Sequence, residues 1–307
     1  MPILLCSLLL TTTGDWPADN SPSARPAATE KVPDAVRLHA FGEQHERLVA
    51  AGRVEEADEV QRKMRAILES PELVELVRLS NTPDLDARIT GAKAALAAGC
   101  RNKAEFEIVI GEAYLRQTDL DAAIAAAQRS LGHRETRHGY FIKGFALLGQ
   151  KRPSEADEVF DRIDTAATQV SVHSRCREYY FRAVAAQLSG KPAKADALYH
   201  QVPTCRDFDR FAVWKTAKHF AFTPDRLRRD ADAVRACSRK LREKSATDAT
   251  ADLVDAYALI ADGRANEAKT TLEAMTTTFP PLVKERQRLL DGLNQTRNAA
   301  RAKGVLQ

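Results

Sequence analysis

Residues 104–163 read AEFEIVIGEAYLRQTDLDAAIAAAQRSLGHRETRHGYFIKGFALLGQKRPSEADEVFDRI, and one pattern occurs twice within them. Each copy carries a small residue, a bulky apolar residue and an alanine at the same spacing, and the second set follows 33 residues after the first: Gly111, Tyr114 and Ala123, then Gly144, Leu147 and Ala156. Stacked helix pairs need a small residue wherever two backbones approach each other. The stretch therefore predicts two consecutive helix-turn-helix units.

The pattern continues on both sides of this stretch. A bulky residue follows the alanine by one helical turn in Ala156 with Phe160, and the same spacing occurs at Ala195 with Tyr199 and at Ala268 with Leu272. A glycine stands five residues before the alanine at Gly52, Gly190 and Gly263, where a turn that tolerates positive φ is needed, whereas the two central copies carry Thr118 and Lys151.

The spacing of the repeat alanines predicts further units that the pattern does not mark. The alanines at positions 57, 123, 156, 195 and 268 are separated by 66, 33, 39 and 73 residues. Because the two long intervals are about twice a unit of roughly 34 residues, each is expected to hold one degenerate hairpin.

These residues resemble the tetratricopeptide repeat family, and the resemblance covers about residues 34–280. It implies an all-α fold, a right-handed superhelical array of antiparallel helix hairpins. An ordinary all-α bundle is the alternative. Residues 281–307 are expected to form a C-terminal capping helix and a tail, since an array needs a polar-faced end to stay soluble.

Composition agrees with an all-helical chain. Alanine dominates the apolar set and aromatic residues make up only 6% of the 307 residues, which favours helix throughout. The net charge of +4 is a small imbalance and does not indicate nucleic-acid binding.

The N-terminus predicts an exported protein. Residues 3–10 are an apolar run that is too short to span a bilayer and at the lower limit for the core of a signal peptide. We interpret residues 1–13 as a possible signal segment and residues 14–33 as a flexible linker, with a periplasmic or extracellular destination. The alternative is a cytoplasmic protein with an incidental apolar terminus.

No motif for catalysis, metal binding or nucleotide binding is present, so we predict a non-enzymatic protein without cofactors. His133 and His138 are five apart, which places them on different faces of a helix and predicts a solvated loop rather than a zinc site. Isolated buried thiols are the state that we favour for the cysteines. A disulfide between Cys176 and Cys205, which start two successive first helices on this alignment, is a hypothesis that requires export.

The resemblance implies binding of a protein or peptide partner on the concave surface, which the first helix of each pair lines. The residues that it places there include Arg116, Phe141, Phe145, Arg177 and Tyr180. The alternative for each aromatic ring is packing between helices. A second candidate function is binding of nucleic acid or an anionic surface by the basic segment 225–244, although its interleaved acids favour a solvated face.

Overall fold

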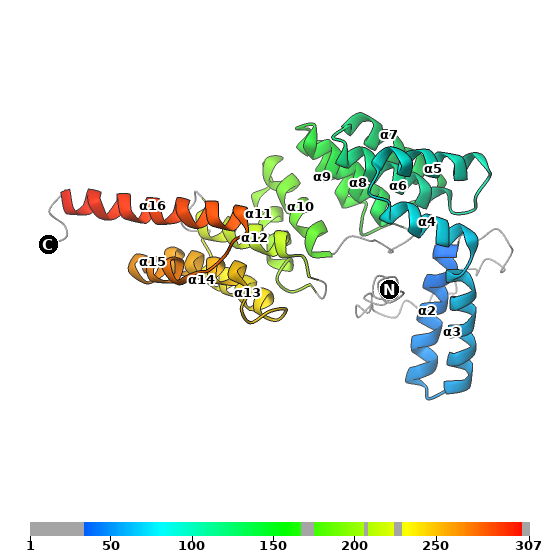
Figure 1. Ribbon diagram of the computed structural model, residues 1–307, viewed down its shortest axis with the longest axis horizontal. Coiled ribbons are helices and arrows are strands. Elements are labelled where there is room, and N and C mark those ends of the chain that lie inside the picture. Colours follow the sequence, from blue (N-terminus) through cyan, green and yellow to red (C-terminus); the bar gives the residue numbers. More distant parts are fainter. Residues whose placement is uncertain (1–33, 167–174, 206–207, 224–228, 303–307) are drawn as a thin grey trace. The chain divides into compact units, whose positions relative to one another are not determined.

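The computed structural model describes residues 34–166, 175–205, 208–223 and 229–302, and within these ranges it is entirely helical (Figure 1). The predicted segments at residues 1–13 and 14–33 lie outside the described residues. The fifteen helices of the described ranges are α2 (Asp34–Ala50), α3 (Val54–Leu68), α4 (Pro71–Asn81), α5 (Leu85–Ala97), α6 (Lys103–Arg116), α7 (Leu120–His133), α8 (Arg137–Gly149), α9 (Pro153–Asp161), α10 (Arg175–Leu188), α11 (Pro192–Gln201), α12 (Arg210–Phe222), α13 (Ala231–Arg242), α14 (Ala249–Ala261), α15 (Ala265–Ala274) and α16 (Pro280–Ala302).

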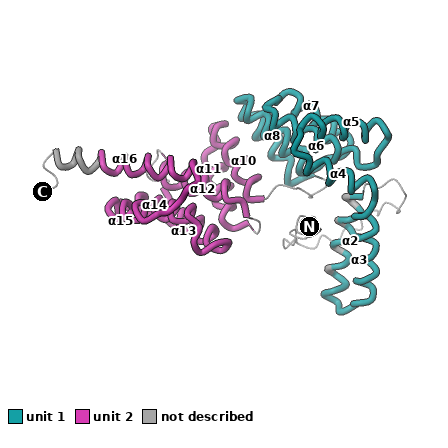
Figure 2. Tube along the Cα trace, in the orientation of Figure 1, with its two compact units in different colours: residues 1–173 teal, residues 174–307 magenta. Residues whose placement is uncertain are grey.

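The helices form seven consecutive hairpins followed by α16, and the chain divides into two units, residues 1–173 and 174–307 (Figure 2). In unit 1, the first helix α6 packs against its partner α7 and also against α8, the first helix of the next hairpin. In unit 2, α12 packs in the same way against α13 and α14. Because these first helices contact both their own partner and the next first helix, the stacking predicted for an α-solenoid of tetratricopeptide-like hairpins is confirmed within each unit.

The two degenerate hairpins exist where the alanine intervals predict them, as α4 with α5 and as α12 with α13. Gly91 lies inside α5, and a Cβ atom there would meet Cδ2 of Leu79 at 2.5 Å. This residue therefore allows close packing against α4, as we expect from its position within a helix. The basic helix begins at Ala231, with Asp230 as its N-cap, and not at residue 225; residues 224–228 lie outside the described part.

The turns between the two helices of a hairpin keep one geometry although the residue varies. Thr118 and Lys151 adopt φ values of 62° and 61°, close to the φ values of the glycines at the equivalent turns, which are 69°, 75° and 79° for Gly52, Gly190 and Gly263. A side chain in this left-handed region costs about 1 kcal/mol. The tertiary packing of the central hairpins therefore imposes the turn even where the sequence lacks glycine.

Small residues let the helices approach, and Gly144 shows how closely. The ring of Phe160 in α9 is fully buried against α8, and a Cβ atom on Gly144 would meet that ring at 2.5 Å. Ala123 and Ala156, the repeat alanines of the two central hairpins, are also fully buried. The positions that the repeat alignment marks as small are thus those where no larger side chain fits.

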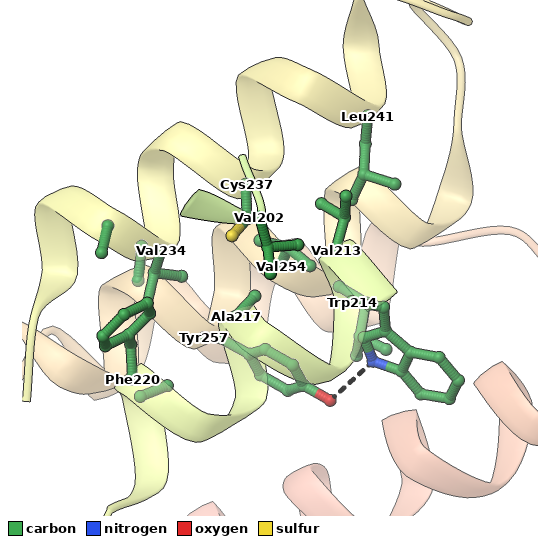
Figure 3. Close-up of a cluster of buried hydrophobic side chains, with 14 of the residues drawn as sticks. Val202, Val213, Trp214, Ala217, Phe220, Val234, Cys237, Leu241, Val254 and Tyr257 are labelled. Atoms are coloured by element: carbon green, nitrogen blue, oxygen red, sulfur yellow. Dashed lines mark hydrogen bonds between the residues drawn. The ribbon is translucent and has the colours of Figure 1, made fainter. Parts of the chain in front are cut away.

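Unit 2 has a continuous core between its hairpins (Figure 3). Val234 and Leu241 of α13 are fully buried in this core, so the line that they form on the helix is internal packing and not a dimer interface. Trp214 of α12 lies at one end of the core and donates a hydrogen bond from Nε1 to the Tyr257 hydroxyl at 3.1 Å (Figure 3). The cluster ties α12, α13 and α14 into one body.

A disulfide joins Cys176 and Cys205 with a Cα–Cα distance of 5.8 Å, in place of the isolated thiols that we favour from the sequence for these two residues. It connects the start of α10 to the segment that follows α11, and Cys176 is fully buried. The pair is a covalent cross-link near the beginning of unit 2. Cys100 and Cys237 are free thiols.

The two ends of the described chain are held differently. Asp34, the first residue of α2, donates its backbone N–H to Oδ1 of Asn102 at 3.0 Å, and Asn102 also donates to Glu72. At the other end, α16 buries Leu282 and Leu289 against unit 2 and packs on α14 and α15. Pro280 and Pro281 form the first turn of α16 rather than preceding it, which suits residues that have no backbone N–H to donate.

Substituting Gly144 with alanine should destabilise unit 1, because the new methyl group would collide with the buried Phe160 ring. Overpacking of this kind costs about 1 to 3 kcal/mol, more than the helix propensity gained. Gly132→Ala in α7 is the matched control, since nothing lies within 4 Å of a Cβ atom there, and it should be neutral or stabilising by up to about 1 kcal/mol. Urea denaturation measures both; a Gly144→Ala variant as stable as the wild type would contradict the packing described for α8 and α9.

Reducing the disulfide should lower the stability of unit 2. The bond closes a loop across a sequence separation of 29 residues. In the chain-entropy account, loss of this cross-link lowers the free energy of unfolding by about 3 to 4 kcal/mol. Denaturation with and without reductant measures the effect, and a variant with Cys176→Ser and Cys205→Ser should not respond to reductant. Non-reducing peptide mapping of protein from its native compartment should recover the Cys176–Cys205 link; finding both as free thiols there would overturn it.

Candidate interaction surfaces

Three of the predicted partner-binding residues lie in unit 1, on the first helices α6 and α8. Arg116 is exposed near the end of α6, and Phe145 is half-buried on α8. Phe141 is only 3% exposed, and its ring centroid lies 6.1 Å from that of Phe145 and 6.2 Å from that of Phe160. Phe141 therefore packs between helices, which is the alternative given above for the aromatic rings, while Arg116 and Phe145 remain accessible.

The other two predicted residues lie in unit 2, on α10. Arg177 forms an ion pair with Asp209 at 2.6 Å, and Asp209 is the N-cap of α12. Tyr180 is half-buried, and its ring centroid lies 5.7 Å from that of Phe211 in an edge-on arrangement. The face of α10 that carries both residues is therefore continuous with α12. Tyr180 belongs to a surface of unit 2, whereas Phe141 lies in unit 1.

A stripe of partly exposed residues runs along α12 next to Tyr180. Phe211 is 42% exposed, and Lys215, Lys218 and Phe222 follow it at helical spacing on the same side, each half-buried. We define the aromatic–lysine surface as Tyr180, Phe181, Phe211, Lys215, Lys218 and Phe222. The ring centroids of Phe181 and Phe211 are 6.4 Å apart, which joins the two helices on this surface.

Lys215 is held by rings rather than by an acid. Its Nζ atom lies 4.7 Å from the ring centroid of Trp214 and 5.5 Å from that of Phe211, within the range of cation–π attraction. No carboxylate in the described part of the chain forms an ion pair with it. Partial burial, and then the neighbouring Lys218, lower the pKa of the Lys215 ammonium. The attraction of a negative group that approaches Lys215 would offset both effects.

Glu285 of α16 forms ion pairs with the other cations beside this surface. Its Oε1 atom receives Lys218 at 2.9 Å, Arg288 at 2.8 Å and the Tyr257 hydroxyl at 2.9 Å. Burial alone would raise the pKa of this carboxyl, but the hydrogen bonds from Arg288, Lys218 and Tyr257 lower it to about 2. Two cations thus share one carboxylate, and together with Lys215 the region keeps an excess of positive charge.

Three cations of the basic helix are matched by acids of the same unit. Arg235 of α13 is paired with Asp232 and Asp262, and Arg242 with Asp252 and Asp255. Lys240 is buried and lies 3.5 Å from Glu243. Because their charges are already matched by acids of the same unit, nothing favours the predicted alternative of nucleic-acid binding.

The histidine pair corrects one sequence expectation. His133 is the last residue of α7 and is exposed, as expected of a solvated position. His138 is not in a loop: it is 3% exposed within α8, and its Nε2 atom lies 3.1 Å from Glu112 of α6. The helix starts earlier than predicted because Thr136 caps it by accepting the Gly139 N–H. Among the described residues no group of three or more metal-ligating side chains is assembled.

Sequence reasoning missed Lys215 and Lys218. Phe211 and Trp214 are spaced as on one side of a helix, but that spacing is equally typical of a core helix. The available signal was a lysine in each helical turn between the aromatic residues of this segment. It becomes interpretable only when the side of α12 that faces solvent is known.

The fold defines the chain as a protein of tetratricopeptide-like helix hairpins, and comparison with known proteins adds little beyond that class. No family model matches the chain, and no curated protein matches it. Among solved structures, the chain is similar to a tetratricopeptide repeat protein from Parabacteroides merdae ATCC 43184, with 16% identity and a TM-score of 0.45 over 83% of this chain and 99% of the other. Within the described residues, no helix has both the length and the apolar character needed to cross a membrane.

The carboxyl of Glu285 should make unit 2 sensitive to acid. Since its pKa is about 2 in the folded chain and 4.5 as the ordinary value, the folded state binds this proton less tightly than the unfolded state. Its contribution to stability is therefore complete above about pH 4.5 and is lost as the pH falls toward 2.

Urea denaturation between pH 6 and pH 2.5 tests this expectation. Unfolding is monitored by the fluorescence of Trp214 in a Trp16→Phe background. Glu285→Gln should flatten the loss of stability below about pH 4.5. Glu273→Gln, at an exposed position of α15, is the control and should keep the slope of the parent. An unchanged slope in Glu285→Gln would show that this carboxyl is not the acid-sensitive group.

Proposed function

We propose that the protein is a non-enzymatic interaction scaffold and that the aromatic–lysine surface of unit 2 binds an acidic peptide segment of a partner protein. The tetratricopeptide-like fold supports a protein partner. The observation that carries the proposal is Lys215, a cation packed between the rings of Trp214 and Phe211 without a carboxylate partner in the described residues.

The chemistry of the surface selects the partner. A carboxylate that reaches Lys215 would form a charge-assisted hydrogen bond beside two aromatic rings, where water is partly excluded. Phe211 is exposed at 42% next to it, and an apolar side chain of the peptide would cover that ring. An acidic residue beside an aromatic or aliphatic one is therefore the segment that fits.

The residues predicted from the sequence fit this proposal in part. Tyr180 extends the surface onto α10, and Arg177 fixes α10 to the start of α12 through Asp209. Arg116 and Phe145 occupy the corresponding first helices of unit 1 and are proposed as contacts for the same kind of partner. Phe141 is left to the core because it is buried.

We place this function in an oxidising compartment. The Cys176–Cys205 disulfide supports export, since such bonds persist in extracellular and periplasmic proteins and are rare in the cytosol. The apolar run at residues 3–10 agrees with it. The thiol mapping described above tests the placement.

A displayed library of random peptides, selected against the full chain, tests the proposed function. Selection should enrich Asp or Glu beside an aromatic or aliphatic residue. For a selected peptide, Lys215→Gln should weaken binding by about tenfold, the loss expected for one charged contact, and Phe211→Ala should weaken it as removal of an aromatic anchor does, by about 1 to 4 kcal/mol.

Lys244→Gln is the matched control, because Lys244 is an exposed lysine of the same unit outside the surface. It should bind like the parent, and all three variants should melt like the parent because they replace accessible side chains. Enrichment of peptides without acids, or equal binding by Lys215→Gln, would overturn the proposal. So would selective, steeply salt-dependent binding of an oligonucleotide in place of peptide.

A further inference from the structure

A cavity of about 370 Å³ lies in unit 1, between helices that take no part in the aromatic–lysine surface. It is lined by α6 and by α5 and α7, the second helices of two successive hairpins, so it lies on the second-helix side of the array. Ala122 and Ala125 leave room on α7 because they have no side chain beyond Cβ, and Leu96 and Ile110 add aliphatic surface. The cavity is therefore large and apolar enough to receive one aromatic side chain.

Two cations at this cavity keep hydrogen-bond donors that the fold does not use. Arg129 donates Nε to Glu107 at 2.8 Å, and its half-exposed side chain makes no other hydrogen bond to the described residues. Lys93 Nζ lies 3.3 Å from the Tyr114 hydroxyl and 5.9 Å from the centre of that ring, and it forms no ion pair with a described carboxylate. Because Glu107 is the one acid among the lining residues, the cavity has an excess of positive charge.

The sequence before the first helix contains a segment that is both acidic and aromatic. Residues 14–19 read GDWPAD, with two carboxylates and no lysine or arginine. Trp16 is one of only two tryptophans in the chain, whereas segments that serve only as linkers contain few aromatic residues. Asp15 stands directly before it. The segment follows the possible signal segment 1–13, so removal of that segment would leave it in place.

The cavity is within reach of this segment inside unit 1. Asp34 donates its backbone N–H at 3.0 Å to Oδ1 of Asn102, the N-cap of α6. Glu107 of the lining is five residues further along the chain, which is about 8 Å along the helix axis. The 18 residues from Trp16 to Asp34 can span up to about 60 Å. A segment tethered this closely has an effective concentration of about 1 mM at the cavity.

We infer that the α5–α6–α7 cavity is a binding site for residues 14–19 of the same chain. The Trp16 ring packs on the alanines of α7, and the Asp15 carboxylate faces Lys93 and Arg129. These acids are side chains within a continuous segment, so the contact needs no chain terminus. The docked segment covers the cavity and holds the N-terminal region of the chain on the second-helix side of unit 1.

NMR of the ¹⁵N-labelled full chain tests this contact, because its two tryptophans give two indole N–H signals, which Trp16→Phe assigns. The reference is the free peptide acetyl-GDWPAD-amide, which has no charged terminus. The Trp16 signal of the parent should differ from that of the free peptide. Its position should stay constant between about 10 and 200 µM protein, since a contact within one chain does not depend on protein concentration.

Charge variants locate the contact. Asp15→Asn and Lys93→Gln should each weaken it by about tenfold, as loss of one charged hydrogen bond predicts, and move the Trp16 signal toward that of the free peptide. The matched controls are Glu30→Gln, an acid of the same N-terminal region, and Lys103→Gln, an exposed lysine of α6 outside the cavity. Both controls should leave the signal in place. The melting temperature of each variant shows that it folds.

Filling the cavity and adding the free peptide give two further measurements. Ala122→Leu should release Trp16, whereas Ala97→Leu at an exposed position of α5 should not. The peptide acetyl-GDWPAD-amide should bind Trp16→Ala about tenfold more tightly than the parent, where the chain's own segment competes. This factor follows from an effective concentration of about 1 mM against a peptide Kd of about 0.1 mM.

Three outcomes would overturn the inference. The first is a Trp16 signal of the parent at the free-peptide position, and the second is a signal that depends on protein concentration. The third is a signal that moves in Lys215→Gln and not in Lys93→Gln, because the segment would then lie on the aromatic–lysine surface. Since the cavity is in unit 1 and Lys215 is in unit 2, failure here leaves the peptide selection that tests the proposed function unaffected.

Discussion

A helix hairpin buries only one side of its apolar surface, and the structure of this chain depends on that constraint. Two helices of this length do not hold together alone, so within each unit a pair is stabilised by its neighbouring pair. Close approach is needed inside a pair as well, because the ring of Phe160 fits against the helix of Gly144 only where no Cβ intervenes. The same need explains the buried alanine of every recognisable repeat.

The constraint also makes some residues readable from sequence and others not. Alanine and glycine at helix crossings recur with the period of the repeat, so the hairpins, including the two degenerate ones, follow from the sequence. The sequence leaves the Cys176–Cys205 pair open as a hypothesis, and the structure brings the start of α10 close to the segment after α11. By contrast, Thr118 and Lys151 adopt the left-handed turn against their own preference, and only the packing of the helices on either side explains that.

Candidate functional residues were less predictable, for a physical reason. Whether a lysine is solvated, paired or held between rings depends on which side of its helix it occupies. A shift of one residue is enough to change that side. Lys215 and the paired Arg235 and Arg242 look alike in the sequence, yet only the latter two meet acids. Glu107 is a similar case, since nothing in the sequence separates a buried glutamate from the many exposed ones.

Alanine-rich helices link the two candidate sites to the fold itself. On α7, Ala123, Ala126 and Ala127 are fully buried and let the helix lie close to its neighbours. The alanines on the side toward α5, Ala122 and Ala125, are equally small, and there the lack of side-chain volume leaves a cavity instead of a close contact. On α12, by contrast, the surface that the next helix does not cover carries aromatic residues and lysines. Small residues therefore leave a cavity on the second-helix side of this repeat array. The first helices can carry the large side chains that a partner would contact.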